Sequence, residues 1–101
     1  MKLVSSEAFK EEVNKDFVVV DFYADWCGPC RMISPFLQEI QDETNIDIIK
    51  VNIDESPDIA TQYDIMSIPT LLIFKKGEKI SSIVGAASKA RLLDWISSHK
   101  K

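Results

Sequence analysis

The chain has 101 residues, enough for one small domain and too few for two, and it is 46% hydrophobic and 28% charged, as in an ordinary soluble globular protein. Its net charge of -4 argues against a nucleic-acid partner, and no apolar run approaches the roughly 20 residues of a membrane span. Charged residues between Glu7 and Lys15 interrupt any apolar core of a secretory signal. We therefore expect one domain over residues 1–101, located in the cytoplasm.

The N-terminal part of the chain is expected to form a strand, a helix and a second strand. Residues 2–4 suit a short edge strand, and Phe9 and Val13, four positions apart, give the next segment one apolar helical face. Residues 17–23 are too rich in β-branched side chains for a comfortable helix. They are apolar on both alternating faces, which is typical of a central strand covered on both sides. Asp21 is the exception within this strand.

The middle of the chain alternates helix and strand in the same way. From Cys30 to about Thr44, apolar residues recur at i, i+3, i+4 and i+7, so a helix is predicted there. Residues 46–53 form a second strongly apolar run, which predicts a strand. Ser56 and Pro57 then suit the N-cap and first position of a third helix.

The last third begins with a break at residues 68–70 and continues with a strand over 71–74. Residues 76–78 indicate a hairpin turn, 80–84 the return strand, and Ser88 the cap of a final helix. The predicted order is β-α-β-α-β-α-β-β-α. Because strand–helix–strand units favour parallel pairing and a hairpin is antiparallel, we expect an α/β fold: a mixed five-stranded sheet flanked by four helices.

The only cysteines, Cys27 and Cys30, stand at the turn between the strand over 17–23 and the next helix. A permanent disulfide would not persist in a reducing compartment, and closing so small a loop would restrain the unfolded chain little. The pair is therefore expected to be catalytic, redox-sensing or metal-binding. Spacing i, i+3 puts both sulfurs on one helix face, and the helix N-terminus lowers the thiol pKa of Cys27. Cys27 is the expected nucleophile and Cys30, one turn deeper, the resolving thiol.

Asp21 and Lys50 are candidates for proton management. An unpaired carboxylate in an apolar strand is costly, and burial would raise its pKa, so that Asp21 could accept the Cys30 proton. Lys50, on the neighbouring predicted strand, is the candidate charge partner. A second interpretation stays open, in which Asp21 only marks the strand end and Lys50 extends to solvent.

Residues 20–30, which read V-D-F-Y-A-D-W-C-G-P-C, resemble the active-site segment of the thioredoxin family, and I-P-T-L-L-I-F at 68–74 and V-G-A at 84–86 follow in that family's order and spacing. The resemblance implies the thioredoxin fold and a thiol-disulfide oxidoreductase that reduces protein disulfides. It implies a monomer without bound cofactor or metal, recharged by a thioredoxin reductase with electrons from NADPH. It supports the catalytic assignments of Cys27, Cys30, Asp21 and Lys50.

The same resemblance assigns roles around the cysteines. Gly28 and Pro29, between the thiols, are expected to set the redox poise. The family has a cis proline at the position of Pro69, whereas cis bonds make up only about 5–6% of X–Pro bonds, so the sequence leaves the state of this bond open. Two positions depart from the family pattern, with Tyr23 where Trp is common and Ser67 where Gly is frequent. The expected substrate groove consists of Trp26, Ile68, Pro69, Gly85 and Ala86.

Three other functions remain as alternatives. A structural zinc site usually has four ligands, whereas this chain offers one cysteine pair and a single distant histidine, His99. A glutaredoxin-like enzyme would be expected to carry C-P-Y-C in place of C-G-P-C. A non-catalytic interaction module with the same fold would bind its partners whatever the redox state of Cys27 and Cys30.

Overall fold

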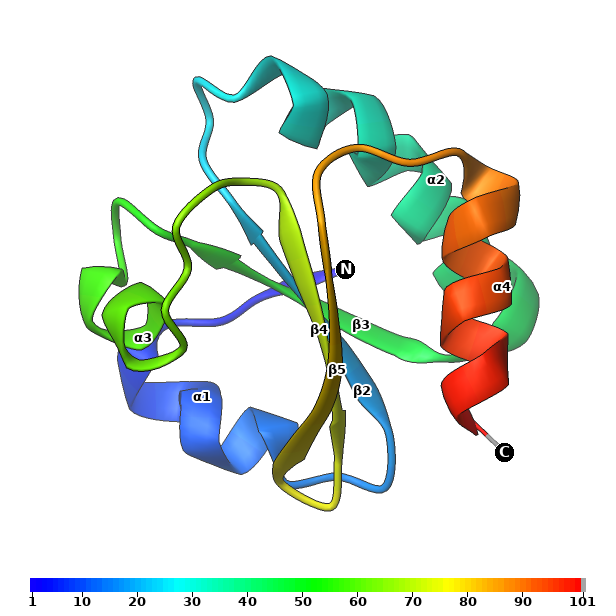
Figure 1. The fold of residues 1–101 in the computed structure, drawn as a ribbon. Helices are drawn as coiled ribbons and strands as arrows, with labels where there is room; N and C mark the ends of the chain where they lie inside the picture. Colours follow the sequence, from blue (N-terminus) through cyan, green and yellow to red (C-terminus); the bar gives the residue numbers. More distant parts are fainter. Residues whose placement is uncertain (101) are drawn as a thin grey trace.

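One mixed sheet of five strands forms the centre of the structure, and helices cover both of its faces (Figure 1). The computed structural model describes residues 1–100, and Lys101, the end of the expected domain, lies outside the described residues. The order of elements predicted from the sequence is confirmed. In chain order the elements are β1 (Lys2–Leu3), α1 (Ser6–Val13), β2 (Val18–Tyr23), α2 (Gly28–Thr44), β3 (Asp47–Asn52), α3 (Pro57–Gln62), β4 (Thr70–Lys75), β5 (Glu78–Val84) and α4 (Lys89–Lys100).

The direction of β4 differs from the prediction. The strands lie in the order β1-β3-β2-β4-β5, and β3 is parallel to both β1 and β2. The strand–helix–strand pattern predicts that β4 is parallel as well, but this prediction is wrong, because β4 runs antiparallel to β2. The hairpin prediction is confirmed, since β5 is antiparallel to β4.

α3 is a short element in the connection between β3 and the reversed strand. Its 6 residues rise about 9 Å, whereas a strand of 6 residues spans about 20 Å. The helical part of the connection therefore covers less than half the length of the sheet. The chain enters β4 at the edge where β2 and β3 end, with Thr70 opposite Phe22 and Tyr23 opposite Asn52.

Two separate apolar clusters fill the two faces, with α1 and α3 over one and α2 and α4 over the other (Figure 1). Side chains alternate along a strand, so one strand contributes to both clusters. On β2, Val20 and Phe22 belong to the cluster under α1 and α3, whereas Val19 belongs to the cluster under α2 and α4. The same alternation places Asp21 on the face covered by α2.

The hairpin between β4 and β5 turns through Lys76 and Gly77, which both have positive φ, at 52° and 85°. Two positive φ values in a two-residue loop define the turn whose twist suits a hairpin, and Asn is favoured over Lys at its first position. We expect Lys76→Asn to stabilise the protein by about 0.5 kcal/mol, measured as a higher urea midpoint. Lys79→Asn removes the same charge from β5, at a position without positive φ, and should not stabilise. Equal effects of the two changes would contradict the turn argument.

Candidate active site

Cys27 and Cys30 form a disulfide bond at the N-terminus of α2, with their Cα atoms 5.3 Å apart. Cys27 is the N-cap, with extended backbone at φ -87° and ψ 108°, and Gly28 is the first helical residue. The helix therefore begins two residues before the start that its apolar spacing predicts. Gly28 and the exposed Pro29 add nothing to the apolar face from which that spacing was read.

The N-terminal end of α2 faces the sulfur atom of Cys27. The backbone N–H of Cys30 donates to Cys27 Sγ at 3.2 Å, which satisfies one of the free N–H groups of the first turn. This donor and the helix dipole both favour negative charge on that sulfur once the disulfide is reduced. Both cysteines are buried, at 4% and 3% exposure. Only a small part of Cys27 is therefore accessible, and a substrate disulfide must approach the protein surface closely to react with its thiolate.

Ile68, which is far from the cysteines in sequence, contacts Cys27, and Gly85 contacts the residue that follows Ile68. The Ile68–Pro69 bond is cis, and the Ile68 carbonyl oxygen lies 3.9 Å from Cys27 Sγ. The Gly85 N–H donates to the Pro69 carbonyl at 2.8 Å and thereby ties the end of β5 to this loop. Gly85 has φ 91°, a conformation that favours glycine. The exposed Ala86 follows it, and the assignment of Gly85 and Ala86 to a substrate groove stays a prediction.

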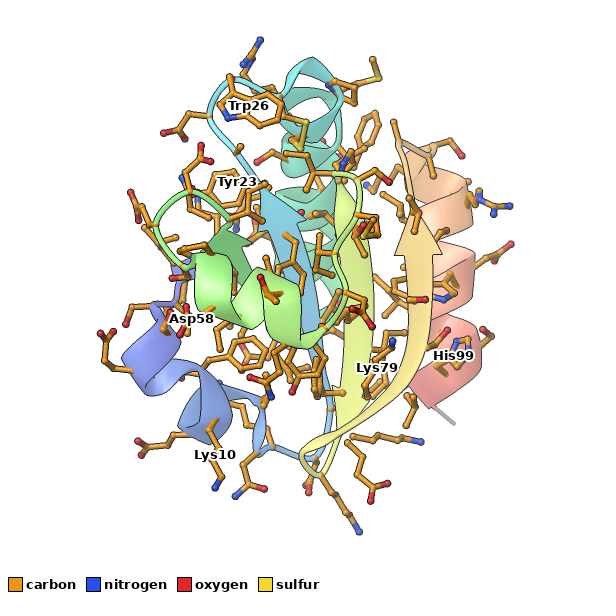
Figure 2. The ribbon with its side chains drawn as sticks, turned by 60° about the vertical axis from the view of Figure 1, so that its left-hand side comes forward. Lys10, Tyr23, Trp26, Asp58, Lys79 and His99 are labelled. Atoms are coloured by element: carbon orange, nitrogen blue, oxygen red, sulfur yellow. A yellow bond between two sulfur atoms is a disulfide. The ribbon has the colours of Figure 1, made fainter. Side chains whose placement is uncertain are left out.

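Trp26 lies at the end of the molecule that carries the disulfide (Figure 2). Its side chain is 67% exposed, and its indole Nε1–H donates to Asp54 Oδ2 at 2.9 Å. Asp54 follows β3, and its contact with Trp26 was not predicted from the sequence. Because β2 and β3 are parallel and end at the same edge, the residues that follow them are neighbours, and this signal could have identified Asp54.

Asp21 lies beneath the start of α2. It is 2% exposed, and it lines a cavity of about 190 Å³ together with Cys30 and Lys50. The carboxylate atom Oδ1 has no hydrogen-bond partner. Burial raises the pKa of Asp21 to about 7, and the positive charge of Lys50 opposes this rise. The structure thus brings together the two groups between which proton transfer was predicted, and Asp21 lies buried within β2, two residues before the end of that strand.

Lys50 stands directly opposite Asp21 in the parallel pairing of β2 and β3. Its ammonium nitrogen lies over the ring of Tyr23, 5.1 Å from the ring centroid. The described residues include no ion pair formed by Lys50. The predicted charge partner of Asp21 therefore acts from a distance, across the cavity, and does not form a close salt bridge.

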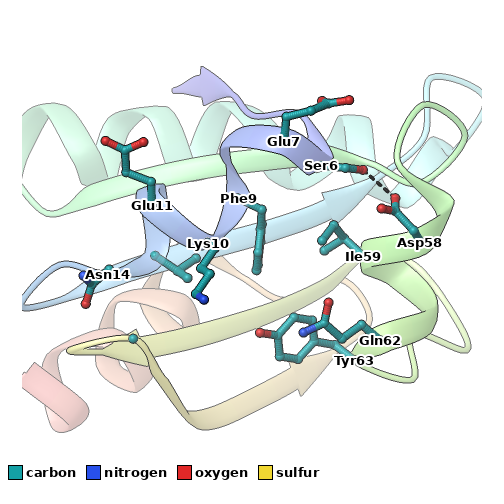
Figure 3. A pocket seen from close by; sticks show the side chains of 12 residues that line it. Ser6, Glu7, Phe9, Lys10, Glu11, Asn14, Asp58, Ile59, Gln62 and Tyr63 are labelled. Atoms are coloured by element: carbon teal, nitrogen blue, oxygen red, sulfur yellow. Dashed lines mark hydrogen bonds between the residues drawn. The ribbon is translucent and has the colours of Figure 1, made fainter.

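A much larger hollow, of about 980 Å³, lies elsewhere, between α1 and α3 (Figure 3). Glu7 and Glu11 point away from it, and Asp58 is held by a hydrogen bond from Ser6. None of the predicted site residues lines this hollow. Pocket size therefore does not identify the reactive site here, whereas the cysteine pair and the buried carboxylate do.

Two further findings concern metal binding and membrane-spanning helices. Within residues 1–100 no group of three or more His, Cys, Asp or Glu side chains is placed to hold a metal ion. None of the helices in the described part of the chain is long and apolar enough to span a membrane.

Comparison with known proteins gives the family. A sequence profile described as Thioredoxin matches residues 1–98. The chain is 50% identical over 100 residues to Thioredoxin 1 of Nostoc sp. strain PCC 7120, covering 95% of this chain and 94% of the relative. It is 46% identical over 100 residues to a thioredoxin of Pyropia yezoensis, with the same coverage of 95% and 94%.

Solved structures agree with the sequence relatives. A mutant thioredoxin from Halobacterium salinarum NRC-1 matches with a TM-score of 0.91 and 32% identity, covering 99% of this chain and 90% of that chain. A thioredoxin from Plasmodium falciparum also matches with a TM-score of 0.91, at 33% identity, covering 98% of this chain and 99% of that one. Together with the disulfide-forming pair at the start of α2, these matches show that the chain belongs to the thioredoxin family of protein-disulfide reductases.

Proposed function

We propose that this protein reduces the disulfides of other proteins in two exchange steps. The Cys27 thiolate attacks one sulfur of the substrate disulfide, forms a mixed disulfide and releases the other substrate sulfur as a thiolate. The Cys30 thiolate then attacks Cys27 Sγ, releases the second substrate sulfur and forms the Cys27–Cys30 disulfide. Two electrons pass from the cysteine pair to the substrate. The observation that carries this assignment is the Cys30 N–H directed at Cys27 Sγ at a helix N-terminus.

Asp21 is proposed as the base that takes the proton of the Cys30 thiol. Both residues line the same cavity, and a carboxylate with a pKa of about 7 changes protonation state near neutral pH. Lys50 is proposed to keep that pKa from rising further. Gly28 and Pro29, the exposed first residues of α2, are proposed to influence the redox potential through the geometry of the helix start.

The substrate is proposed to bind in the groove formed by Trp26 and by the two loops beside the disulfide. The exposed indole offers an apolar surface, and the Ile68 carbonyl beside Cys27 Sγ is close enough to orient an incoming chain. A partner bound there would hold its disulfide in line with Cys27. The proposed members of this groove are Trp26, Ile68, Pro69, Gly85 and Ala86.

The oxidised pair must be reduced again for turnover, and we propose that a thioredoxin reductase does this with electrons from NADPH. A cysteine pair that must be reduced again after each turnover suits a reducing compartment, which favours the cytoplasm. The proposed working form is a monomer that holds no cofactor of its own, in which residues 1–101 make one domain.

The direct test is a coupled assay. The protein, NADPH and a thioredoxin reductase are mixed with a protein disulfide, and NADPH consumption and substrate thiols are both recorded. We expect turnover that requires all four components, and none with Cys27→Ser. If the protein is folded and its thiols are free but no turnover occurs, the proposed disulfide reduction is wrong. Partner binding that survives in the Cys27→Ser/Cys30→Ser variant would instead support a redox-independent interaction module.

The order of attack is tested by trapping. Cys30→Ser leaves Cys27 able to attack but removes the thiol that resolves the mixed disulfide, so a covalent substrate adduct should accumulate through Cys27. Non-reducing electrophoresis and peptide mapping identify the linked cysteine. Cys27→Ser is the matched control and should give no stable adduct. If Cys27→Ser accumulates the adduct, the two roles are reversed.

Asp21→Asn tests the proton acceptor. In the parent protein the resolving step should accelerate as pH rises through about 7, because Asp21 becomes ionised there. With Asn the acceleration near pH 7 should be lost, and single-turnover release of the reduced substrate measures it. Asp94→Asn, which changes an exposed carboxylate on α4 that does not line the cavity, is the matched control and should retain the pH profile. An unchanged profile in Asp21→Asn would remove Asp21 from the mechanism.

The same variant has a second readout, in stability. The folded-state pKa of Asp21 lies above its unfolded value of 3.8, so its contribution is fully present below about pH 4 and is lost as pH rises to about 7. Above pH 7 the parent should bear a cost of about 4 kcal/mol for the buried ionised carboxylate. Asp21→Asn should therefore be more stable than the parent at pH 8 and nearly equal to it at pH 4, measured by urea unfolding of the oxidised proteins.

A further inference from the structure

The Lys50 ammonium group lies over an aromatic ring, and its residue stands opposite a buried carboxylate. It sits over the ring of Tyr23, 5.1 Å from the centroid, and its residue pairs in register with Asp21. Tyr23, Lys50 and Asp21 all line the cavity that Cys30 also borders. Figure 2 shows Tyr23 toward the same end of the molecule as Trp26. Tyr23 has no role in the exchange steps described above, so its place beside the charge partner of Asp21 needs an explanation.

The ring restricts where the ammonium can go. A lysine side chain has a flexible four-carbon stem, and its strongly hydrated ammonium otherwise tends to extend into water. Lys50 is only half-buried, so solvent is within its reach. A ring face within about 6 Å attracts the cation and opposes that extension. Since Lys50 forms no ion pair with any described residue, the ring is the contact that the structure records for its ammonium.

We propose that Tyr23 is a positioning residue for the Asp21–Cys30 proton transfer: its ring holds the Lys50 ammonium where the charge acts on Asp21 across the cavity. The functional meaning of this inference rests on the proposed role of Asp21, but the positioning itself does not. Without the ring, the ammonium would spend more time in solvent, and Asp21 would lose part of the positive charge that favours its ionised form.

The other charged or titratable groups around the cavity do not replace Lys50. Arg31 lines the cavity from α2, but its Nη1 donates to the Asp25 carbonyl at 2.6 Å, outside the strand. Cys30 is held in the disulfide, and Asp25 and the more remote Glu55 carry negative charge, which would raise the pKa of a nearby acid. Lys50 is the charge that lowers the pKa of Asp21 against the effect of burial.

A purely structural role for Tyr23 predicts the opposite sign. If the ring only excluded water from the cavity, replacing it with a smaller side chain would hydrate Asp21 and lower its pKa. If the ring positions Lys50, the same replacement moves positive charge away and raises that pKa. The direction of the change therefore separates the two roles.

The test is a titration of the Asp21 carboxyl carbon by NMR in the oxidised protein, where no thiol titrates. Tyr23→Leu should raise the measured pKa by about 0.5, the amount that one half-exposed cation–ring contact can supply. Tyr23→Phe keeps the ring and removes the hydroxyl, so it should leave the pKa close to that of the parent. Amide spectra check that each variant is folded, and Tyr23→Trp serves as a second ring-retaining variant if Tyr23→Phe is perturbed.

A double mutant tests whether the effect passes through Lys50. Lys50→Met alone should raise the pKa of Asp21 by more than Tyr23→Leu does, because it removes the charge completely. Adding Tyr23→Leu to Lys50→Met should then change nothing further. A fall in pKa, no change in Tyr23→Leu, or an equal rise with and without Lys50 would overturn the inference. These outcomes are independent of catalysis, so they are distinguishable from a failure of Asp21→Asn to alter the resolving step.

Discussion

The return of the chain to one edge of the sheet is the constraint on which the site depends. β2 and β3 are parallel and end at the same edge, and the short α3 covers less than half the length of the sheet. The chain returns to that edge, and β4 starts where β2 ends, with Thr70 opposite Phe22. Because of this reversal, the Ile68–Pro69 loop lies beside Cys27, at the sulfur it contacts. A parallel β4 would have placed Pro69 at the far edge, and no groove would border the disulfide.

A second constraint is the carboxyl group of Asp21, which lies buried beneath that edge and is costly to ionise. Holding a carboxylate with a pKa of about 7 costs about 4 kcal/mol once it is ionised, out of a total stability that is commonly 5–15 kcal/mol for a small domain. Neighbouring inward positions on β2 and β4 hold Val19 and Leu71, which shows that apolar side chains fit this layer. A group that costs this much and borders Cys30 is best explained by its chemistry, because structures depart from local consistency mainly at functional sites.

Local sequence signals predicted the elements and the reactive pair well. The β-branched run before Cys27 predicts a strand, and the apolar spacing after Cys30 predicts a helix. Each signal depends on the residues of a single element, and both the strand and the helix are confirmed. The direction of β4 was predicted wrongly, because it depends on the edge of the sheet to which the connection after β3 returns, which no local pattern records. The Trp26–Asp54 hydrogen bond was missed for a related reason: it joins segments that meet only when β2 and β3 pair.

The sequence also did not predict that the Lys50 ammonium lies apart from the Asp21 carboxylate, although both residues were recognised as candidates. Their register places them opposite each other, yet the Lys50 ammonium lies over the ring of Tyr23 and forms no ion pair with Asp21. A direct salt bridge would favour the ionised carboxylate strongly and leave a weak base. Complete removal of the charge would leave burial unopposed and the acid protonated at neutral pH. A cation held at an intermediate distance gives the acid a pKa near the pH at which a proton acceptor is most effective, so the spacing itself has a chemical consequence.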